Sequence, residues 1–305
     1  KGIAESHALT AHAQTSSVAS KNTIKGSFDI GKNIFTLNDH FKIAMIQDAG
    51  GFYQAGYQDN AEVIKVPIDV VIGSGTKGQT YLYWYNNKLF QLPVSYYTPV
   101  NDWCNSPGFP KNQLLFNRPI FGRCLECHAT FAKTTFSDIG VEEYQKDNMI
   151  YGISCERCHG PAAEHVAFQL ANPADKIARH IVNPAKLSRQ QKLDNCALCH
   201  SGLRKVSQPS FSYIAGDKLD DYSTPDYKPD SSAVLDVHGN QYGLLTASKC
   251  LKMSQMDCSS CHNTHQQETN NKLAFSGKCM NCHSEEKHNF CTQSRKNNLV
   301  LEENC

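Results

Sequence analysis

The chain of 305 residues has no apolar run that approaches the length of a membrane span, and no excess of charge of either sign. A transmembrane helix needs about 20 consecutive apolar residues, so we expect no transmembrane segment. The 30 Lys and Arg residues balance 29 Asp and Glu residues, which excludes the basic surface of a nucleic-acid-binding protein. The chain also opens without the basic and apolar segments of an export signal, so we expect any such signal to have been removed.

Cysteine, by contrast, is abundant, with 14 residues. A reducing cytosol rarely supports a structural framework of so many thiols. Ten of them form five copies of one pattern, Cys-x-x-Cys-His, at unequal intervals that argue against a repeat solenoid. The five copies are motif 1 (Cys124, Cys127, His128), motif 2 (Cys155, Cys158, His159), motif 3 (Cys196, Cys199, His200), motif 4 (Cys258, Cys261, His262) and motif 5 (Cys279, Cys282, His283).

This pattern is typical of the covalent attachment of a c-type haem. Two thiols three residues apart lie on one face of a helical turn, where they can add to the two vinyl groups along one edge of a porphyrin. The adjoining His then reaches the iron as the proximal ligand. Zinc sites also use Cys-x-x-Cys, but in pairs that supply four ligands. Five copies, each followed by His, therefore predict five haems c.

Four cysteines lie outside the motifs, and they are Cys104, Cys250, Cys291 and Cys305. An even remainder in an exported protein suggests two disulfides. Cys291 with Cys305 would tie down the C-terminal tail, and Cys104 with Cys250 would join the N-terminal half to the haem region. The sequence does not choose among the three pairings, and free thiols are the alternative.

The composition divides the chain into three parts. Residues 1–25 are small and polar, and predict an extended or weakly helical N-terminal arm. Residues 26–115 are β-rich. Residues 116–305 hold every motif and predict a pentahaem cytochrome domain of short helices and loops, with little regular secondary structure because the porphyrins would supply the buried apolar bulk. The expected fold class is therefore α+β.

Within the β-rich region, alternating segments at 42–47 and 52–58 flank a turn, and an aromatic strand at 80–85 ends at Asn86-Asn87, a typical hairpin turn. These signals predict an antiparallel meander that forms a small sheet or an open barrel. The stretch 101–119, with three prolines, is expected to be a linker.

Several segments together resemble the cytochrome c554-like family of multihaem cytochromes. They are 152–165, 180–184, 237–242, the Ser-Lys-Cys250 step and the Cys-His-x-x-His element at 261–265. The resemblance covers roughly residues 116–290, and the segments 73–78 and 105–108 also resemble a subgroup with an N-terminal β region. Relatives in this subgroup often carry another Cys-x-x-Cys-His just upstream of a segment like 3–16. The resemblance therefore implies that the protein has lost a haem or that the sequence is shortened.

Eight His residues outside the motifs are available as sixth ligands, and bis-His ligation by neutral imidazole suits low-potential electron transfer. The expected distal ligands are His165, His238 and His265, followed by His288, His12 and His180. His165 opens a helix after motif 2 and matches the family pattern. His265 follows His262 on the same helical face, so it must serve another haem. We expect His40 and His7 to be ordinary polar residues.

The Thr10-Ala-His12 pattern is also family-like, and implies that His12 orders the N-terminal arm by binding an iron. The arm would fold back onto a haem of its own chain, which effective concentration favours. Alternatively, it would reach a haem of the next subunit in a head-to-tail contact that can propagate into a filament.

These features together predict an electron carrier in which five closely spaced, mostly bis-His haems exchange electrons with redox partner proteins. The alternatives are a haem enzyme with one open five-coordinate iron, acting on a small nitrogen compound or peroxide, and a subunit of an extracellular conductive filament. The chain has no Cys-x-x-Cys-Lys motif, so it does not resemble pentahaem nitrite reductases at their catalytic centre, and we assign no catalytic residue. Haem attachment to this motif takes place outside the cytoplasmic membrane, which predicts a periplasmic or extracellular protein.

Overall fold

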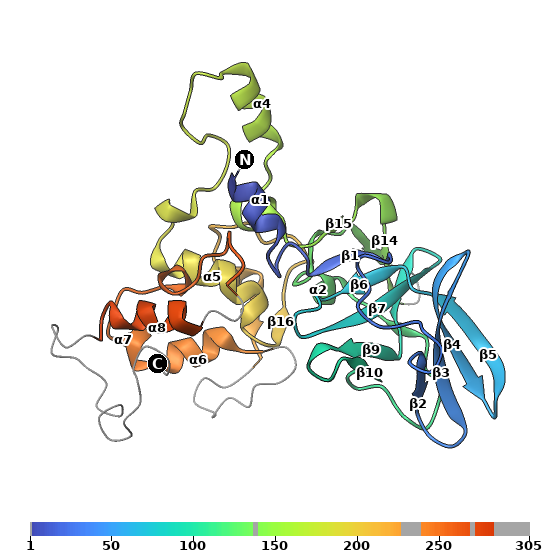
Figure 1. Ribbon diagram of the computed structural model, residues 1–305. Coiled ribbons are helices and arrows are strands. Elements are labelled where there is room, and N and C mark those ends of the chain that lie inside the picture. Colours follow the sequence, from blue (N-terminus) through green and yellow to red (C-terminus); the bar gives the residue numbers. More distant parts are fainter. Residues whose placement is uncertain (1, 137–139, 227–238, 269–271, 284–305) are drawn as a thin grey trace, which may run out of the picture.

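The protein consists of a β half and a half made of short helices, hairpins and loops (Figure 1). The structure, a computed structural model, describes residues 2–136, 140–226, 239–268 and 272–283. The predicted α+β class, with the sheets in the N-terminal part, is confirmed. None of the helices in these residues is long and apolar enough to cross a membrane.

The β half contains two antiparallel sheets. The four-stranded sheet has the order β2-β3-β4-β5, with β2 (Ile34–Thr36), β3 (Phe41–Asp48), β4 (Gly51–Gln58) and β5 (Ala61–Pro67). The seven-stranded sheet runs β1-β6-β7-β8-β11, with β9 paired to β7 and β10 to β9. Its strands are β1 (Ser16–Val18), β6 (Val70–Ile72), β7 (Gly78–Tyr85), β8 (Lys88–Gln91), β9 (Val94–Tyr97), β10 (Asp102–Asn105) and β11 (Arg118–Pro119).

The predicted meander is thus present, but as two sheets. Its hairpin turns use residues that tolerate left-handed backbone. Asn86 and Asn87 both have positive φ, 46° and 59°, between β7 and β8, as do Asp59 and Asn60 between β4 and β5. A two-residue turn of this kind matches the right-handed twist of the strands it joins.

The core of the β half lies between the two sheets. Ile43 and Met45 from β3 meet Tyr81 from β7 and Trp103 from β10 in one buried cluster. The Trp103 ring lies 5.8 Å from the ring of Tyr81, and its Nε1 donates to the Ser27 carbonyl at 3.0 Å. A Cβ added to Gly26 would lie 2.1 Å from this ring, so the indole packs directly against the Gly26 backbone.

Replacing Trp103 by Ala is expected to destabilise the protein by about 3–5 kcal/mol, because the substitution leaves a large cavity in a packed core and an unpaired carbonyl. Chemical denaturation followed by far-UV circular dichroism measures the change. Tyr85→Ala is the matched control, since Tyr85 is an aromatic residue that is 61% exposed. Equal midpoints for the two variants would contradict the assignment of Trp103 to the core.

Two segments in which no strand was expected contribute strands to the seven-stranded sheet. The linker at 101–119 contains β10 and β11, and Ser16 of the N-terminal arm pairs with Ile72 of β6. The linker prediction is therefore wrong at both ends of that stretch. A strand of two to four residues has too little alternation to be recognised from the sequence. These segments become strands only because they pair with exposed edges of the sheet.

The second half is built on short elements. The N-terminal arm contains α1 (Gly2–Ala8). The helices of the second half are α2 (Gly122–Leu125), α3 (Cys155–His159), α4 (Ala163–Ala171), α5 (Arg189–His200), α6 (Gln241–Ala247), α7 (Lys249–Lys252) and α8 (Lys272–Met280). Its two-stranded sheets pair β12 (Ala129–Phe131) with β15 (Ile150–Tyr151), β13 (Thr134–Phe136) with β14 (Glu142–Tyr144), and β16 (Arg204–Val206) with β17 (Ser223–Pro225).

Two features organise this half. The longest of these helices, α5, begins at a capping box formed by Ser188 and Gln191, and buries Leu193, Ala197 and Leu198. A second apolar cluster, which includes Leu82 of β7 and Leu125 of α2, joins the two halves. By contrast, α4 has no buried residue and projects from the body (Figure 1).

Candidate haem-binding site

Each motif lies on a helical turn or at the end of one. Motif 2 fills α3, motif 3 ends α5, and motifs 1 and 5 continue from α2 and α8. Motif 4 starts with a 3-10 turn at Cys258–Ser260. In motifs 4 and 5 the backbone N–H of the His donates to the carbonyl of the first Cys, at 2.9 and 3.0 Å. These bonds close the single turn that two-point attachment requires.

Motifs that are far apart in the sequence are in contact through their thiols. The thiols of Cys127 in motif 1 and Cys199 in motif 3 are close enough to shift each other's pKa, and so are those of Cys196 in motif 3 and Cys258 in motif 4. The Cys199 thiol lowers the pKa of Cys127 to about 7, although burial opposes this shift. Both thiols of motif 3 thus face a thiol of another motif, so α5 lies between two other attachment turns.

Two His residues outside the motifs lie beside motif His residues. The ring centroids of His12 and His200 are 5.9 Å apart, and those of His159 and His265 are 6.1 Å apart. Two imidazoles that bind one metal ion from opposite sides, with metal–nitrogen bonds of about 2 Å, have centroids about 6 Å apart. Burial lowers the pKa of His12, which keeps its ring in the neutral form that binds iron.

Three motif His residues direct their Nδ1 atoms at three different kinds of partner. His128 Nδ1 lies 2.9 Å from the Thr15 hydroxyl, His159 Nδ1 3.0 Å from the Val182 carbonyl, and His262 Nδ1 3.5 Å from a carboxylate oxygen of Glu268. A ring that binds a metal through Nε2 carries its proton on Nδ1, and such a partner fixes both tautomer and orientation.

The other predicted distal ligands are placed differently. His165 and His180 lie on the projecting segment around α4, where His165 Nδ1 is 2.7 Å from the Arg179 carbonyl and His180 Nδ1 is 3.6 Å from Glu164. In the described part of the chain, neither makes a ring contact with a motif His. His238 and His288 lie outside the described residues.

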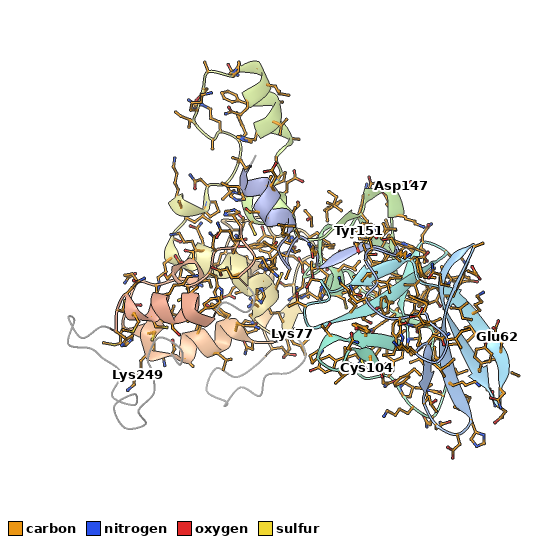
Figure 2. All side chains as sticks on the ribbon, viewed as in Figure 1. Glu62, Lys77, Cys104, Asp147, Tyr151 and Lys249 are labelled. Carbon is orange, nitrogen blue, oxygen red and sulfur yellow. The ribbon has the colours of Figure 1, made fainter. Side chains whose placement is uncertain are left out.

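The other His and Cys residues singled out in the sequence include His40, Cys104 and Cys250, which lie within the described residues. His40 is exposed and pairs with Asp59 at 2.7 Å, as expected of an ordinary polar residue. Cys104 and Cys250 are both free, so a disulfide between them is wrong for this structure. Figure 2 shows why: Cys104 lies on the β half, while Lys249, the neighbour of Cys250, lies at the far end of the other half. Cys291 and Cys305 fall outside the described residues.

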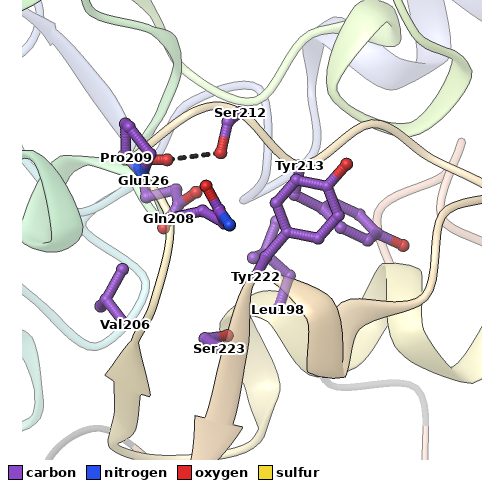
Figure 3. Close-up of a pocket in the computed structure, with 9 residues that line it drawn as sticks. All are labelled: Glu126, Leu198, Val206, Gln208, Pro209, Ser212, Tyr213, Tyr222 and Ser223. Carbon is purple, nitrogen blue, oxygen red and sulfur yellow. Dashed lines mark hydrogen bonds between the residues drawn. The ribbon is translucent and has the colours of Figure 1, made fainter.

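The sequence did not lead us to the charged residues at the junction of motifs 1, 2 and 3. Glu126 of motif 1 is buried, and it lines a small cavity with Leu198 of α5 and Tyr213 (Figure 3). The one signal available was that the variable positions of motifs 1 and 2 include charges of opposite sign.

The donor set fits c-type haem. Pairs of thiols on single turns, each followed by an imidazole, match two thioethers and one iron ligand, and the two pairs of His rings have the spacing of two imidazoles that would bind one iron. Within the described residues, no group of three or more His, Cys, Asp or Glu side chains is placed to hold a metal ion by itself.

Comparison with known proteins agrees with this chemistry. The family described as cytochrome c554 and c-prime matches residues 115–160, which contain motifs 1 and 2. The multiheme cytochrome MtrA of Shewanella baltica (strain OS185) is 26% identical over 186 residues, covering 54% of this chain and 53% of that protein. The chain is a multihaem c-type cytochrome.

The crystal structure of the outer cell wall cytochrome OcwA extends the similarity to the fold of this cytochrome. It aligns with a TM-score of 0.51 and 18% identity, covering 93% of this chain and 54% of that one. The cytochrome thus spans about half the length of both proteins that it matches.

Proposed function

We propose that this cytochrome transfers electrons through five closely spaced c-type haems. The observation that carries the proposal is the contact between thiols of different motifs, Cys127 with Cys199 and Cys196 with Cys258. A thioether joins each sulfur to a porphyrin edge through one carbon, so porphyrins attached to adjacent sulfurs approach each other closely. Each bound haem supplies an iron that accepts and returns one electron.

Bis-His ligation supports the same function. We propose His200 with His12 as the axial pair at motif 3, and His159 with His265 at motif 2, from their ring separations of 5.9 and 6.1 Å. Two imidazoles on one iron would leave no open position for a small substrate. His165, His180, His238 and His288 are the candidates for the remaining sixth positions.

The partners of the motif His residues would give these haems different reduction potentials. A hydroxyl, a carbonyl and a carboxylate face the Nδ1 atoms of His128, His159 and His262. A stronger acceptor makes the imidazole a stronger donor to iron, which stabilises the oxidised state. We therefore propose the lowest potential at motif 4, beside Glu268. Because c-type attachment takes place after export, we propose a periplasmic or extracellular location and exchange with soluble or surface-bound redox proteins.

The holoprotein is expected to retain five haems after acid–acetone extraction, because ten thioethers cannot be extracted. Intact mass under denaturing conditions counts them, and iron analysis should agree. Fewer than five would show that one motif is not used, and zinc in place of iron would refute the proposed function. Electron paramagnetic resonance of the oxidised protein should show low-spin iron only. A substantial high-spin signal would favour an enzyme with one open coordination position.

A further inference from the structure

Motifs 1, 2 and 3 share a buried network of charged side chains. An Oε2 atom of Glu126 accepts from Arg123 at 3.0 Å, and its Oε1 lies 3.4 Å from Nη2 of Arg157. The same Arg157 nitrogen donates to the Glu126 carbonyl at 3.2 Å, while Arg123 donates to the Leu198 carbonyl at 3.0 Å. Cys199 also approaches the Glu126 carbonyl, at 3.8 Å. One carboxylate and two guanidinium groups thus connect three attachment turns.

The two central residues occupy variable positions of the haem motifs themselves. Glu126 precedes Cys127 in motif 1, and Arg157 precedes Cys158 in motif 2. The two residues of the ion pair are therefore each bonded to a cysteine that would hold a haem. Arg123 lies one turn before Cys127, and its Nη1 is 3.6 Å from that sulfur.

The network is desolvated and carries surplus positive charge. The side chains of Glu126 and Arg157 are each only 7% exposed. Two guanidinium groups face one carboxylate, and Nε of Arg157 has no acceptor among the described residues. The Arg157 guanidinium instead lies 5.4 Å from the centroid of the Phe211 ring. Fixed charge in a low-dielectric interior acts on its neighbours far more strongly than charge at the surface.

We propose that Glu126, Arg157 and Arg123 form a positioning joint that sets the mutual placement of the haems at motifs 1, 2 and 3, and that its net positive charge raises their reduction potentials. This inference rests on the proposed function. A positive charge favours the iron state with one more electron, so the sign of the effect follows from electrostatics. Breaking the buried pair from either side would leave an uncompensated charge.

The sign of the potential shift tests the proposal. Arg157→Met removes one positive charge and keeps an unbranched apolar stem, so at least one haem should become harder to reduce. Glu126→Gln removes the negative charge and keeps an acceptor for the Phe211 N–H, which lies 2.9 Å away, so the shift should have the opposite sign. The double variant has the original net charge and should return toward the wild-type titration. Spectroelectrochemical titration of the holoproteins measures all three.

Lys65→Met is the matched control, because Lys65 pairs with Asp48 at 2.9 Å on the surface of the β half. It removes one positive charge far from every motif and should leave the titration unchanged. If Arg157→Met does not assemble with its haems, Arg157→Lys takes its place because it keeps the positive charge. Glu126→Gln then still gives the sign of the potential shift. If the reduction potentials of variants that retain all haems shift with the same sign, or do not shift, the proposed joint is refuted. The proposed electron transfer is not affected by that result. Loss of reducible haem from the wild-type protein would instead count against the proposed function.

Discussion

Replacing His265 by Ala is expected to convert one haem from low-spin to high-spin while all haems stay covalently attached. The ring of His265 lies 6.1 Å from that of His159, and its backbone carbonyl accepts from the Ser6 hydroxyl at 2.8 Å, which holds the segment in place. Removal of the imidazole would leave the proposed iron at motif 2 with one ligand fewer. Electron paramagnetic resonance and visible spectra of the oxidised protein report the change.

Two controls distinguish an iron ligand from a histidine with a structural role only. His40→Ala is the control, since His40 pairs only with Asp59 on the surface of the β half, and its spectra should match those of the wild type. Exogenous imidazole should restore low-spin iron to His265→Ala, because it can occupy the position left open. Spectra of His265→Ala identical to wild type would remove His265 from the list of ligands.

Deleting residues 1–20 is expected to have a larger effect, because the N-terminal arm contacts three attachment turns. His12 lies beside His200 of motif 3, Thr15 meets His128 of motif 1, and the His12 carbonyl accepts from Ile153, next to motif 2. The deletion also removes β1 from the sheet. We expect one high-spin haem, a changed potential at motif 1 and a lower melting temperature.

His12→Ala sharpens this test. The variant keeps β1 and the contact between Thr15 and His128. It should therefore lose one low-spin haem without the loss of stability that is expected of the deletion. In this structure the arm folds onto its own chain, so a monomeric wild type should stay monomeric in both variants. Disassembly of a larger particle on deletion would instead show that the arm binds a neighbouring subunit. Unchanged spectra in both variants would show that the arm holds no iron.

The fold was predictable where local signals were strong. Alternation in β3 and β4, and the Asn pair after β7, identify the central meander because side chains alternate across a strand and a two-residue turn needs positive φ. The edges were not predictable. β1 and β11 have three and two residues, and their strand character comes from the partner they meet.

The sequence by itself determined the chemistry of this cytochrome. Covalent attachment of haem depends on the spacing of two cysteines within one helical turn, and that spacing can be read from the five complete motifs. Local sequence also nominated His12 and His265 as ligands. Only the tertiary structure decided which motif each one faces, because the partners are brought together across 188 residues of chain in one pair and 106 in the other. The same holds for Glu126 and Arg157. Their charges are visible in the motifs, but a buried ion pair exists only once the turns of motifs 1 and 2 come together and exclude water.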